Sequence, residues 1–310
     1  MKAVRIYEFG GPEVLKVEDI EKPVPAADEL LIKVYATSIN PVDFKIRSGK
    51  NYQRYHNPMP MTLGFDVSGV VEEIGKDVTN FKTGDEVYAR PDLNRDGAFA
   101  EYITMPAAKV GFKPKSISHN EAAAVPLVGL TAWQGLFDHG KLQPNQRVLI
   151  HAASGGVGTF AIQFAKWKGA HVIGTASGDN LDFLKQLGAD EVIDYKKQKF
   201  EDLLKDIDVV FDLIGGDTQK RSVQVLKEGG ILVSTLGIVD KDLLAQKNIH
   251  GEAYMAQSIP DQLNQIAALI DEGKIHPVIA KVLPLNQAAE AQKESEEGHV
   301  RGKIVLEVVG

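Results

Sequence analysis

The sequence predicts a two-part protein of the α/β plus β class, with an all-β barrel or sandwich followed by a doubly wound parallel sheet. Two observations predict this. Short apolar or alternating runs broken by Gly, Pro and Asp fill the chain to about residue 120, and strand-like and helix-like runs alternate after Gln146. The 310 residues suffice for two domains, which we expect at 1–121 together with 274–310, and at 122–273.

The N-terminal part shows the pattern of half-buried strands. Residues 29–39 are an example, because Leu30, Ile32 and Val34 alternate with more polar neighbours. In the segment 119–140 the spacing of apolar residues changes and alanine and leucine dominate. Asn120 is a candidate N-terminal helix cap, and Gly140 is a candidate residue for the end of the helix. We therefore expect a helix to open the second part.

The second part alternates between buried strands and helices. Apolar runs at 147–152 and 170–176 flank a helical pattern, and the same rhythm continues to about residue 237. Such alternation indicates a parallel sheet covered by helices on both faces. The tail, with one helix between two strands at 278–309, is expected to return to the first domain.

Composition excludes several classes of function. The chain has no cysteine, which rules out disulfides, a thiolate nucleophile and cysteine-ligated zinc. Its formal net charge is −7 and its basic runs are short, so no nucleic-acid partner is expected. The N-terminus lacks the apolar region of a signal peptide and no apolar run approaches a membrane span, so we expect a cytoplasmic protein without a membrane partner.

The segment "RVLIHAASGGVGTF" places a glycine-rich turn between a strand and a helix, which is the context of a dinucleotide-binding turn. In the G-x-G-x-x-G pattern Ala153 takes the first position. Gly155 then leaves room for a pyrophosphate near the backbone, and Gly158 lets the helix pack closely on the strand. The alternative is a turn whose glycines serve steric needs alone.

The end of the second strand, "GTASGDN", predicts which dinucleotide is bound. An NAD pocket usually has a carboxylate there, whereas Thr175 and Ser177 leave space for a 2′-phosphate, so NADPH is favoured over NADH. Asp179 is the opposing signal, although it equally suits a helix cap. Tyr195, after the third strand, is a candidate phosphate or adenine contact, or simply an edge tyrosine.

The run "NQRVLIHAASGGVGTFAIQFAK" resembles the signature of the zinc-independent quinone oxidoreductases related to zeta-crystallin, within the medium-chain dehydrogenase/reductase superfamily. "SINPVDFKIRSG", "GLTAW" and "GADEVIDY" extend the resemblance over nearly the whole chain. It implies a GroES-like β-barrel domain and a Rossmann domain. Where zinc-dependent relatives have a catalytic cysteine this chain has Asn40, and where they have the histidine of G-H-E it has Phe65, so we expect no metal.

The resemblance also supplies candidate site residues. The candidate catalytic residues are Asn40, Asp43 and Tyr52, with a helix-capping role as the alternative for Asp43. The candidate cofactor-binding residues are Lys45, Thr131, Ser154, Gly155, Gly156, Val157, Gly158, Ser177, Tyr195, Leu236, Gly237 and Lys303.

Together these features predict hydride transfer from NADPH to a small-molecule quinone or α,β-unsaturated carbonyl, since an electron-poor acceptor needs no metal to activate it. The alternatives are a 2-alkenal or enone double-bond reductase with little quinone activity, and a non-catalytic, crystallin-like NADPH-binding protein. The resemblance further implies a homodimer, with pairing of nucleotide-domain edge strands as one route.

Overall fold

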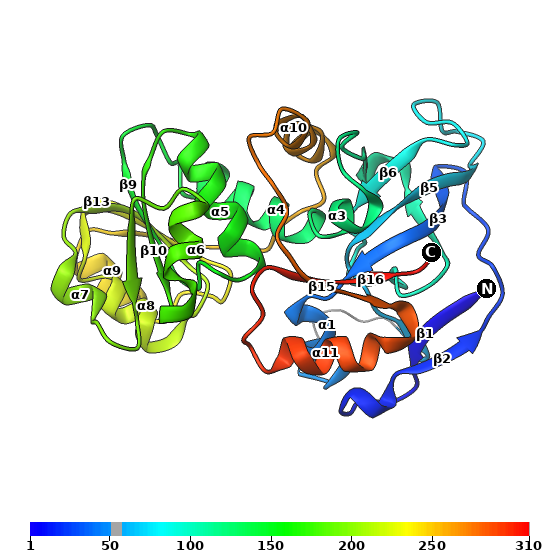
Figure 1. The fold of residues 1–310 in the computed structure, drawn as a ribbon, viewed down its shortest axis with the longest axis horizontal. Coiled ribbons are helices and arrows are strands. Elements are labelled where there is room, and N and C mark those ends of the chain that lie inside the picture. Colours follow the sequence, from blue (N-terminus) through cyan, green and yellow to red (C-terminus); the bar gives the residue numbers. More distant parts are fainter. Residues whose placement is uncertain (51–57, 310) are drawn as a thin grey trace. The chain divides into compact units, whose positions relative to one another are not determined.

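The structure, a computed structural model, describes residues 1–50 and 58–309, and its chain forms two compact units. Unit 1 comprises 1–127, 258–273 and 277–310, and unit 2 comprises 128–257 and 274–276. Figure 1 follows the chain through both units in sequence colours. The described part of each unit contains its own sheets and its own buried apolar core.

Unit 1 is built on two mixed or antiparallel sheets. The three-stranded sheet has the order β2-β1-β4, and the larger one runs β15-β16-β3-β5-β6-β8 with β7 also paired to β3. Their strands are β1 (Lys2–Ile6), β2 (Lys16–Asp19), β3 (Glu29–Ser38), β4 (Met61–Thr62), β5 (Val67–Ile74), β6 (Glu86–Ala89), β7 (Tyr102–Pro106), β8 (Val110–Phe112), β15 (Ile279–Pro284) and β16 (Lys303–Glu307). The β16 strand pairs with β3, so the C-terminal segment returns to the barrel unit.

The helices of unit 1 pack against these sheets or against one another. They are α1 (Pro41–Arg47), α3 (His119–Ala123), α10 (Pro260–Asp271) and α11 (Ala288–Glu296), with short 3₁₀ turns at η1 (Pro12–Val14), η2 (Ala107–Lys109) and η5 (Leu285–Gln287). In α1 the buried Arg47 donates to Gln292 and Glu296 of α11, which joins the two helices. The two lie side by side in Figure 1.

The position of α10 differs from the division expected from sequence, which placed it in the nucleotide-binding domain. Its buried face contains Leu263, and the Tyr88 hydroxyl of β6 donates to the Leu263 carbonyl oxygen at 2.5 Å. The helix therefore belongs to unit 1. An amphipathic pattern identifies the face that must be buried, but not the sheet that buries it.

Unit 2 is a six-stranded parallel sheet of order β11-β10-β9-β12-β13-β14. Its strands are β9 (Arg147–Ile150), β10 (His171–Ala176), β11 (Glu191–Asp194), β12 (Ile207–Asp212), β13 (Leu226–Ser234) and β14 (His250–Ala253). The strand order reverses between β10 and β12 around β9, which is where ligands bind in sheets of this kind. The doubly wound α/β class predicted from the sequence is confirmed.

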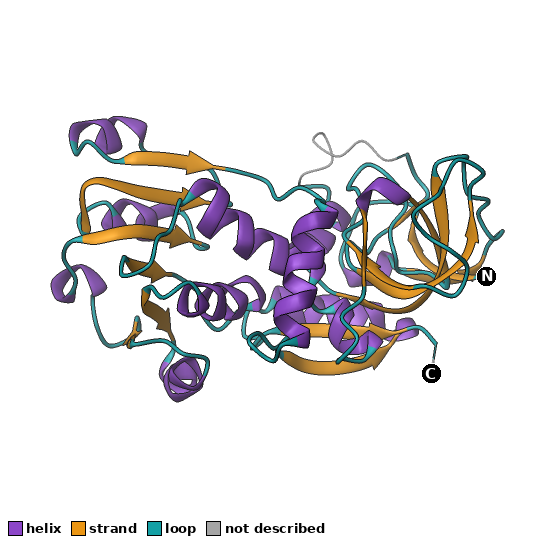
Figure 2. Cartoon of the chain, turned by 90° about the horizontal axis from the view of Figure 1, so that it is seen from above, coloured by secondary structure: helices purple, strands orange, loops and turns teal. Residues whose placement is uncertain are grey.

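Helices cover this sheet on both sides (Figure 2). They are α5 (Gly156–Trp167), α6 (Leu181–Gln186), α7 (Phe200–Leu203), α8 (Gly216–Ser222), α9 (Lys241–Gln246), the 3₁₀ turn η4 (Gly178–Asn180) and the π-helix η3 (Gln134–His139). The π-helix continues α4 (Pro126–Trp133), which begins in unit 1 and runs into unit 2. None of the described helices is long and apolar enough to cross a membrane.

Candidate active site

The glycine turn lies between the end of β9 and the start of α5. Gly155 precedes the helix with extended backbone, φ −78° and ψ 176°, and no side chain caps the helix there. A Cβ built on Gly155 would have only the Ala152 oxygen nearby, at 3.4 Å, whereas one on Gly158 would lie 2.5 Å from that same oxygen. Gly158 is thus required by the packing of the chain itself, while the space beside Gly155 is left open.

The first turn of α5 fits a pyrophosphate. Gly155, Gly156 and Val157 are half-exposed, and Gly156 and Val157 present the amides of the helix start. The first turn holds no acidic residue to compete with an anion. Ser154 is half-exposed beside it. Free N–H groups and the positive end of the helix dipole favour a bound phosphate here.

Two further predicted residues lie at the same edge of the sheet. Ser177 follows β10, Tyr195 follows β11, and the Tyr195 amide donates to the Ala176 oxygen at 3.2 Å, so the strand ends are adjacent. Tyr195 is 58% exposed and the lysines at 196 and 197 are exposed beside it. This arrangement places hydroxyl groups and positive charge where a 2′-phosphate is expected.

Asp194 is a carboxylate in this region that the sequence reasoning missed. It ends β11, is buried, and accepts the Lys196 amide at 3.0 Å. Its Oδ2 lies 2.9 Å from a Cβ built on Gly178 and 3.8 Å from the Lys197 ammonium. The strand register, Ala176 opposite Asp194, is what brings it next to Ser177, and register cannot be read from one sequence.

Leu236 and Gly237 follow β13, also at the carboxyl end of the sheet. Leu236 is about half-exposed, and a Cβ on Gly237, whose φ is +90°, would meet nothing within 4 Å. Thr131 lies in α4, is largely buried, and its carbonyl oxygen accepts the Tyr254 hydroxyl at 2.5 Å. The predicted cofactor residues of unit 2 other than Thr131 thus share the carboxyl edge of the parallel sheet.

In unit 1 the structure brings Asn40, Asp43 and Lys303 together in one buried polar network. The Lys303 ammonium donates to the Asn40 Oδ1 at 2.5 Å and to the Ile39 carbonyl oxygen at 2.6 Å. All three side chains are almost completely buried. Lys303 therefore points into the protein and is held by internal partners, where the sequence led us to expect a cofactor contact.

Asp66 is the centre of this network, and the sequence reasoning gave it no role of its own. Its Oδ2 accepts from Ser38 Oγ at 2.6 Å and Asn40 Nδ2 at 2.7 Å, and lies 3.3 Å from the Lys303 ammonium. Its Oδ1 accepts the Leu127 amide at 2.6 Å. Asp66 consequently ties the end of β3, the last strand β16 and the start of α4 into one hydrogen-bonded unit.

Asp43 caps α1 by a capping box, the alternative that the sequence left open. Its two oxygens accept the Asn40 amide at 2.7 Å and the Gly64 amide at 3.0 Å. Burial raises its pKa to about 7, an effect opposed by these hydrogen bonds and by Lys303. Burial likewise lowers the pKa of Lys303, against the pull of Asp66 and Asp43.

Two other predicted residues belong to the same part of the chain. Lys45 lies in α1 and is half-buried. Tyr52, the candidate proton donor, falls outside the described residues.

His151 directly follows β9 and is held as a neutral imidazole. The Ser222 hydroxyl donates to the Thr218 oxygen at 2.7 Å, so at 2.8 Å it accepts from His151 Nε2–H, and Nδ1 then accepts from Thr175 at 3.0 Å. Burial lowers the His151 pKa to about 4. The His151 imidazole is thus buried next to the glycine turn and held in one orientation by a hydrogen bond at each ring nitrogen.

We expect this histidine to make the protein less stable in acid. Between about pH 6.5 and 4 the unfolded chain binds a proton that folded His151 does not, so stability falls as the pH falls, by about 3 kcal/mol in all. Urea unfolding at a series of pH values measures this loss. A His151→Gln variant should have a flatter profile in that window, and an equally steep one would show that other groups cause the loss.

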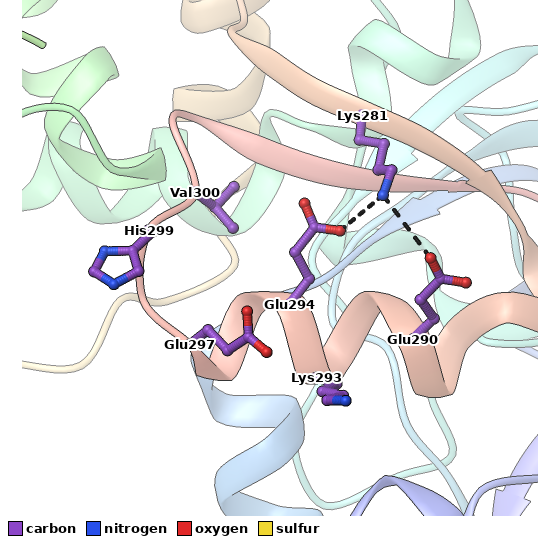
Figure 3. A pocket seen from close by; sticks show the side chains of 7 residues that line it. All are labelled: Lys281, Glu290, Lys293, Glu294, Glu297, His299 and Val300. Atoms are coloured by element: carbon purple, nitrogen blue, oxygen red, sulfur yellow. Dashed lines mark hydrogen bonds and ion pairs between the residues drawn. The ribbon is translucent and has the colours of Figure 1, made fainter. Parts of the chain in front are cut away.

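The described residues also form a surface pocket of about 490 Å³ in unit 1, on β15 and α11. Figure 3 shows Lys281 reaching toward Glu294, at 2.9 Å, and Glu290, at 3.9 Å. Its lining is mostly charged, with Lys281 paired to Glu290 and Glu294, and Val300 contributes an apolar side chain. None of the candidate site residues that the structure describes lines this pocket.

Among the described residues no group of three or more His, Asp or Glu side chains is arranged to hold a metal ion. At the two positions where zinc ligands were considered, Phe65 is packed in the apolar core and Asn40 is engaged with Asp66 and Lys303.

Comparison with known proteins identifies related sequences over both units. Residues 26–115 match the family model "Alcohol dehydrogenase GroES-like domain", and residues 187–306 match "Zinc-binding dehydrogenase". Human mitochondrial NAD(P)H oxidoreductase RTN4IP1 is 37% identical over 100% of this chain and 89% of its own. The chloroplastic NADPH-dependent alkenal/one oxidoreductase of Arabidopsis thaliana is 37% identical, over 99% of this chain and 79% of its own. Mouse quinone oxidoreductase is 32% identical, over 99% of this chain and 97% of its own.

Solved structures agree with this relationship. The Coxiella burnetii quinone oxidoreductase has a TM-score of 0.93 at 37% identity, covering 100% of this chain and 99% of its own. The structure of an NAD-dependent alcohol dehydrogenase has a TM-score of 0.92 at 33% identity, and the match covers 100% of both chains. The Escherichia coli quinone oxidoreductase complexed with NADPH has a TM-score of 0.91 at 31% identity, and the match covers 99% of this chain and 100% of its own. The chain therefore belongs to the medium-chain dehydrogenase/reductase superfamily, in its quinone oxidoreductase group.

Proposed function

We propose that this protein is an NADPH-dependent oxidoreductase that reduces a quinone or an α,β-unsaturated carbonyl. The observation that carries the proposal is the turn at Gly155, where the chain leaves open space beside an uncapped helix start. Relatives named as quinone oxidoreductases and as an alkenal/one oxidoreductase support the class of acceptor.

The residues of unit 2 would bind NADPH in an extended form along the carboxyl edge of the sheet. Ser154 and the amides of Gly156, Val157 and Gly158 would hold the pyrophosphate. Ser177, Tyr195 and the neighbouring lysines would hold the 2′-phosphate, and Leu236 and Gly237 would lie beside the nicotinamide. When bound, NADPH supplies the hydride, and the protein contributes orientation and exclusion of water.

In unit 1 the buried network gives Asn40 and Asp43 a positioning role, because their polar atoms are already engaged. They would hold α1, and with it Lys45, in place. Tyr52 remains our candidate proton donor to the reduced product. We propose that no zinc takes part, since neither Phe65 nor Asn40 in its present bonding can supply a ligand.

The alkenal or enone double-bond reductase is the second candidate function. It is supported by the alkenal/one oxidoreductase of Arabidopsis thaliana, which is 37% identical to this chain, the same identity as the Coxiella burnetii quinone oxidoreductase. Both reactions need the same NADPH site, so the choice between them depends on the acceptor.

The test is NADPH oxidation by the purified protein with a panel of quinones, 2-alkenals and simple ketones. We expect turnover with conjugated acceptors and not with simple ketones, and a preference for NADPH over NADH. Turnover restricted to simple ketones would contradict the acceptor class. Tighter binding of NADH would contradict the 2′-phosphate assignment, a sharp question because one structural neighbour is named NAD-dependent.

We further propose a cytoplasmic homodimer, formed by pairing of the β14 edge strands of two copies. The edge position of β14 in the sheet supports such pairing. Because the human relative RTN4IP1 is named as mitochondrial, the cellular location of this protein needs a direct test. Fractionation of the native cells provides that test, and we expect the protein in the cytoplasmic fraction. Sedimentation of the purified protein determines the oligomeric state.

A further inference from the structure

Asp212, the last residue of β12, is a fully buried carboxylate that binds the loop following it. Its Oδ1 accepts the backbone amides of Ile214 at 3.0 Å and Gly215 at 2.8 Å. Its Oδ2 accepts the Gln219 side-chain amide and the Ser234 hydroxyl, both at 2.8 Å. With four donors directed at it, the carboxylate is satisfied without contact to solvent.

Gln219 of α8 and Ser234 of β13 carry the same network to the next loop. The Gln219 Nε2 also donates to the Gly237 oxygen at 2.8 Å, and its Oε1 accepts the Val239 amide at 2.7 Å. The Ser234 Oγ accepts the Leu236 amide at 3.1 Å. Two loops that follow adjacent parallel strands are therefore fastened to one buried centre.

The network holds three particular residues through their own backbone amides: Ile214, Leu236 and Val239. These three are among the exposed large apolar side chains of the chain, with 51%, 48% and 46% of their surface accessible. A Cβ on Gly215 would lie 3.3 Å from Leu236 Cδ1, so the two loops are in contact. Exposed apolar side chains on loops are ordinarily mobile. The backbone of these three residues is instead held by hydrogen bonds to a buried polar network.

The place of this apolar group in the sheet indicates what it would contact. β12 pairs with β9, whose turn carries Gly155, and with β13, so the loops lie one and two strands from the glycine turn. Two strand spacings are about 10 Å, within the span of a dinucleotide whose pyrophosphate lies at the turn.

We propose that Asp212 and Gln219 are positioning residues, which hold Ile214, Leu236 and Val239 as a rigid apolar platform for the planar nicotinamide end of the bound cofactor. The proposal rests on the proposed function and extends it to residues that touch no ligand. A firm apolar platform would keep water from the ring and fix its distance to the acceptor, so loosening it should slow hydride transfer more than it weakens binding of the adenosine end.

The experiment compares Gln219→Met with Gln224→Met. Methionine removes the hydrogen bonds of Gln219 at similar volume, and Gln224 is an exposed glutamine just beyond the same helix. For each variant we would measure the affinity for NADPH, the affinity for 2′,5′-ADP, which occupies the adenosine end alone, and the single-turnover rate of hydride transfer at saturating NADPH.

For Gln219→Met we expect 2′,5′-ADP affinity within twofold of the parent and hydride transfer about 10- to 100-fold slower. Gln224→Met should match the parent in all three. Unchanged transfer in Gln219→Met would overturn the proposal, and so would an equal loss of 2′,5′-ADP and NADPH binding, which indicates general disruption of unit 2.

Ser234→Ala keeps the test available if Gln219→Met does not fold. It removes one of the four donors to Asp212 and the acceptor of the Leu236 amide, and it leaves the bonds of Gln219 in place. We expect a smaller loss of transfer rate, recovered by Ser234→Thr, with 2′,5′-ADP affinity unchanged. A parent-like rate in Ser234→Ala would count against the platform. Failure of the unaltered protein to bind either NADPH or 2′,5′-ADP is a different result: it would overturn the proposed function itself.

Discussion

Gly158→Ala is expected to destabilise the fold severely, whereas Gly155→Ala should leave it nearly unchanged. The new Cβ at position 158 would lie 2.5 Å from the Ala152 oxygen and 2.6 Å from the Ala153 Cα, both backbone atoms that cannot swing aside. We expect a cost of about 3 kcal/mol, the upper range for overpacking a buried site. At Gly155 the nearest atom is 3.4 Å away and φ is −78°, so alanine fits. Urea unfolding of both variants measures the difference.

The same two glycines separate folding from binding. Gly155→Val should fold, yet its side chain would occupy the space that the pyrophosphate needs, and NADPH affinity should fall at least tenfold, or about 1.4 kcal/mol. Gly155→Ala is the matched control, with a smaller loss. If Gly155→Val bound NADPH like the parent, the pyrophosphate would have to lie elsewhere. Parent-like stability of Gly158→Ala would contradict the close packing of α5 on the turn.

The glycine turn illustrates what one sequence can predict. A strand-like run, small residues and an amphipathic helix are all local, and local patterns determined both the α/β class and the location of this turn. The place of Ser177 and Tyr195 at neighbouring strand ends followed from the same alternation. These predictions needed no knowledge of which side chains meet across the fold.

The polar networks could not be predicted in this way, because their members are distant in sequence. Asp66 meets Lys303, and Gln219 meets Val239, only after the sheets have formed. The four residues 303–306 of β16 are all buried, so alternation gave no clue that Lys303 faces inward. One usable signal was present: an aspartate ending a buried strand, followed three residues later by two glycines at 215 and 216, predicts a carboxylate that binds a tight turn.

Lys303→Met is expected to destabilise the protein by about 3–5 kcal/mol at pH 8, because it leaves the Asp66 carboxylate buried without its cation. The Asn40 and Ile39 oxygens would also lose their donor. Lys281→Met is the control within the same unit: Lys281 is paired with Glu294 at the surface, where solvent screens the pair, and a much smaller change is expected. Urea unfolding followed by circular dichroism compares the two variants.

The pH dependence of this loss tests its electrostatic origin. Because the pKa of Asp43 is raised to about 7, folded Asp43 keeps its proton between about pH 4 and 7 while the unfolded chain has lost it, so its contribution to stability declines as the pH rises through that window. The charge of Lys303 opposes this rise in the pKa of Asp43, so without Lys303 protonation of Asp43 should relieve more of the damage. The loss caused by Lys303→Met should therefore be smaller at pH 5 than at pH 8. A loss that is independent of pH would identify Lys303 as a packing residue, and one no larger than that of Lys281→Met would contradict the buried network altogether.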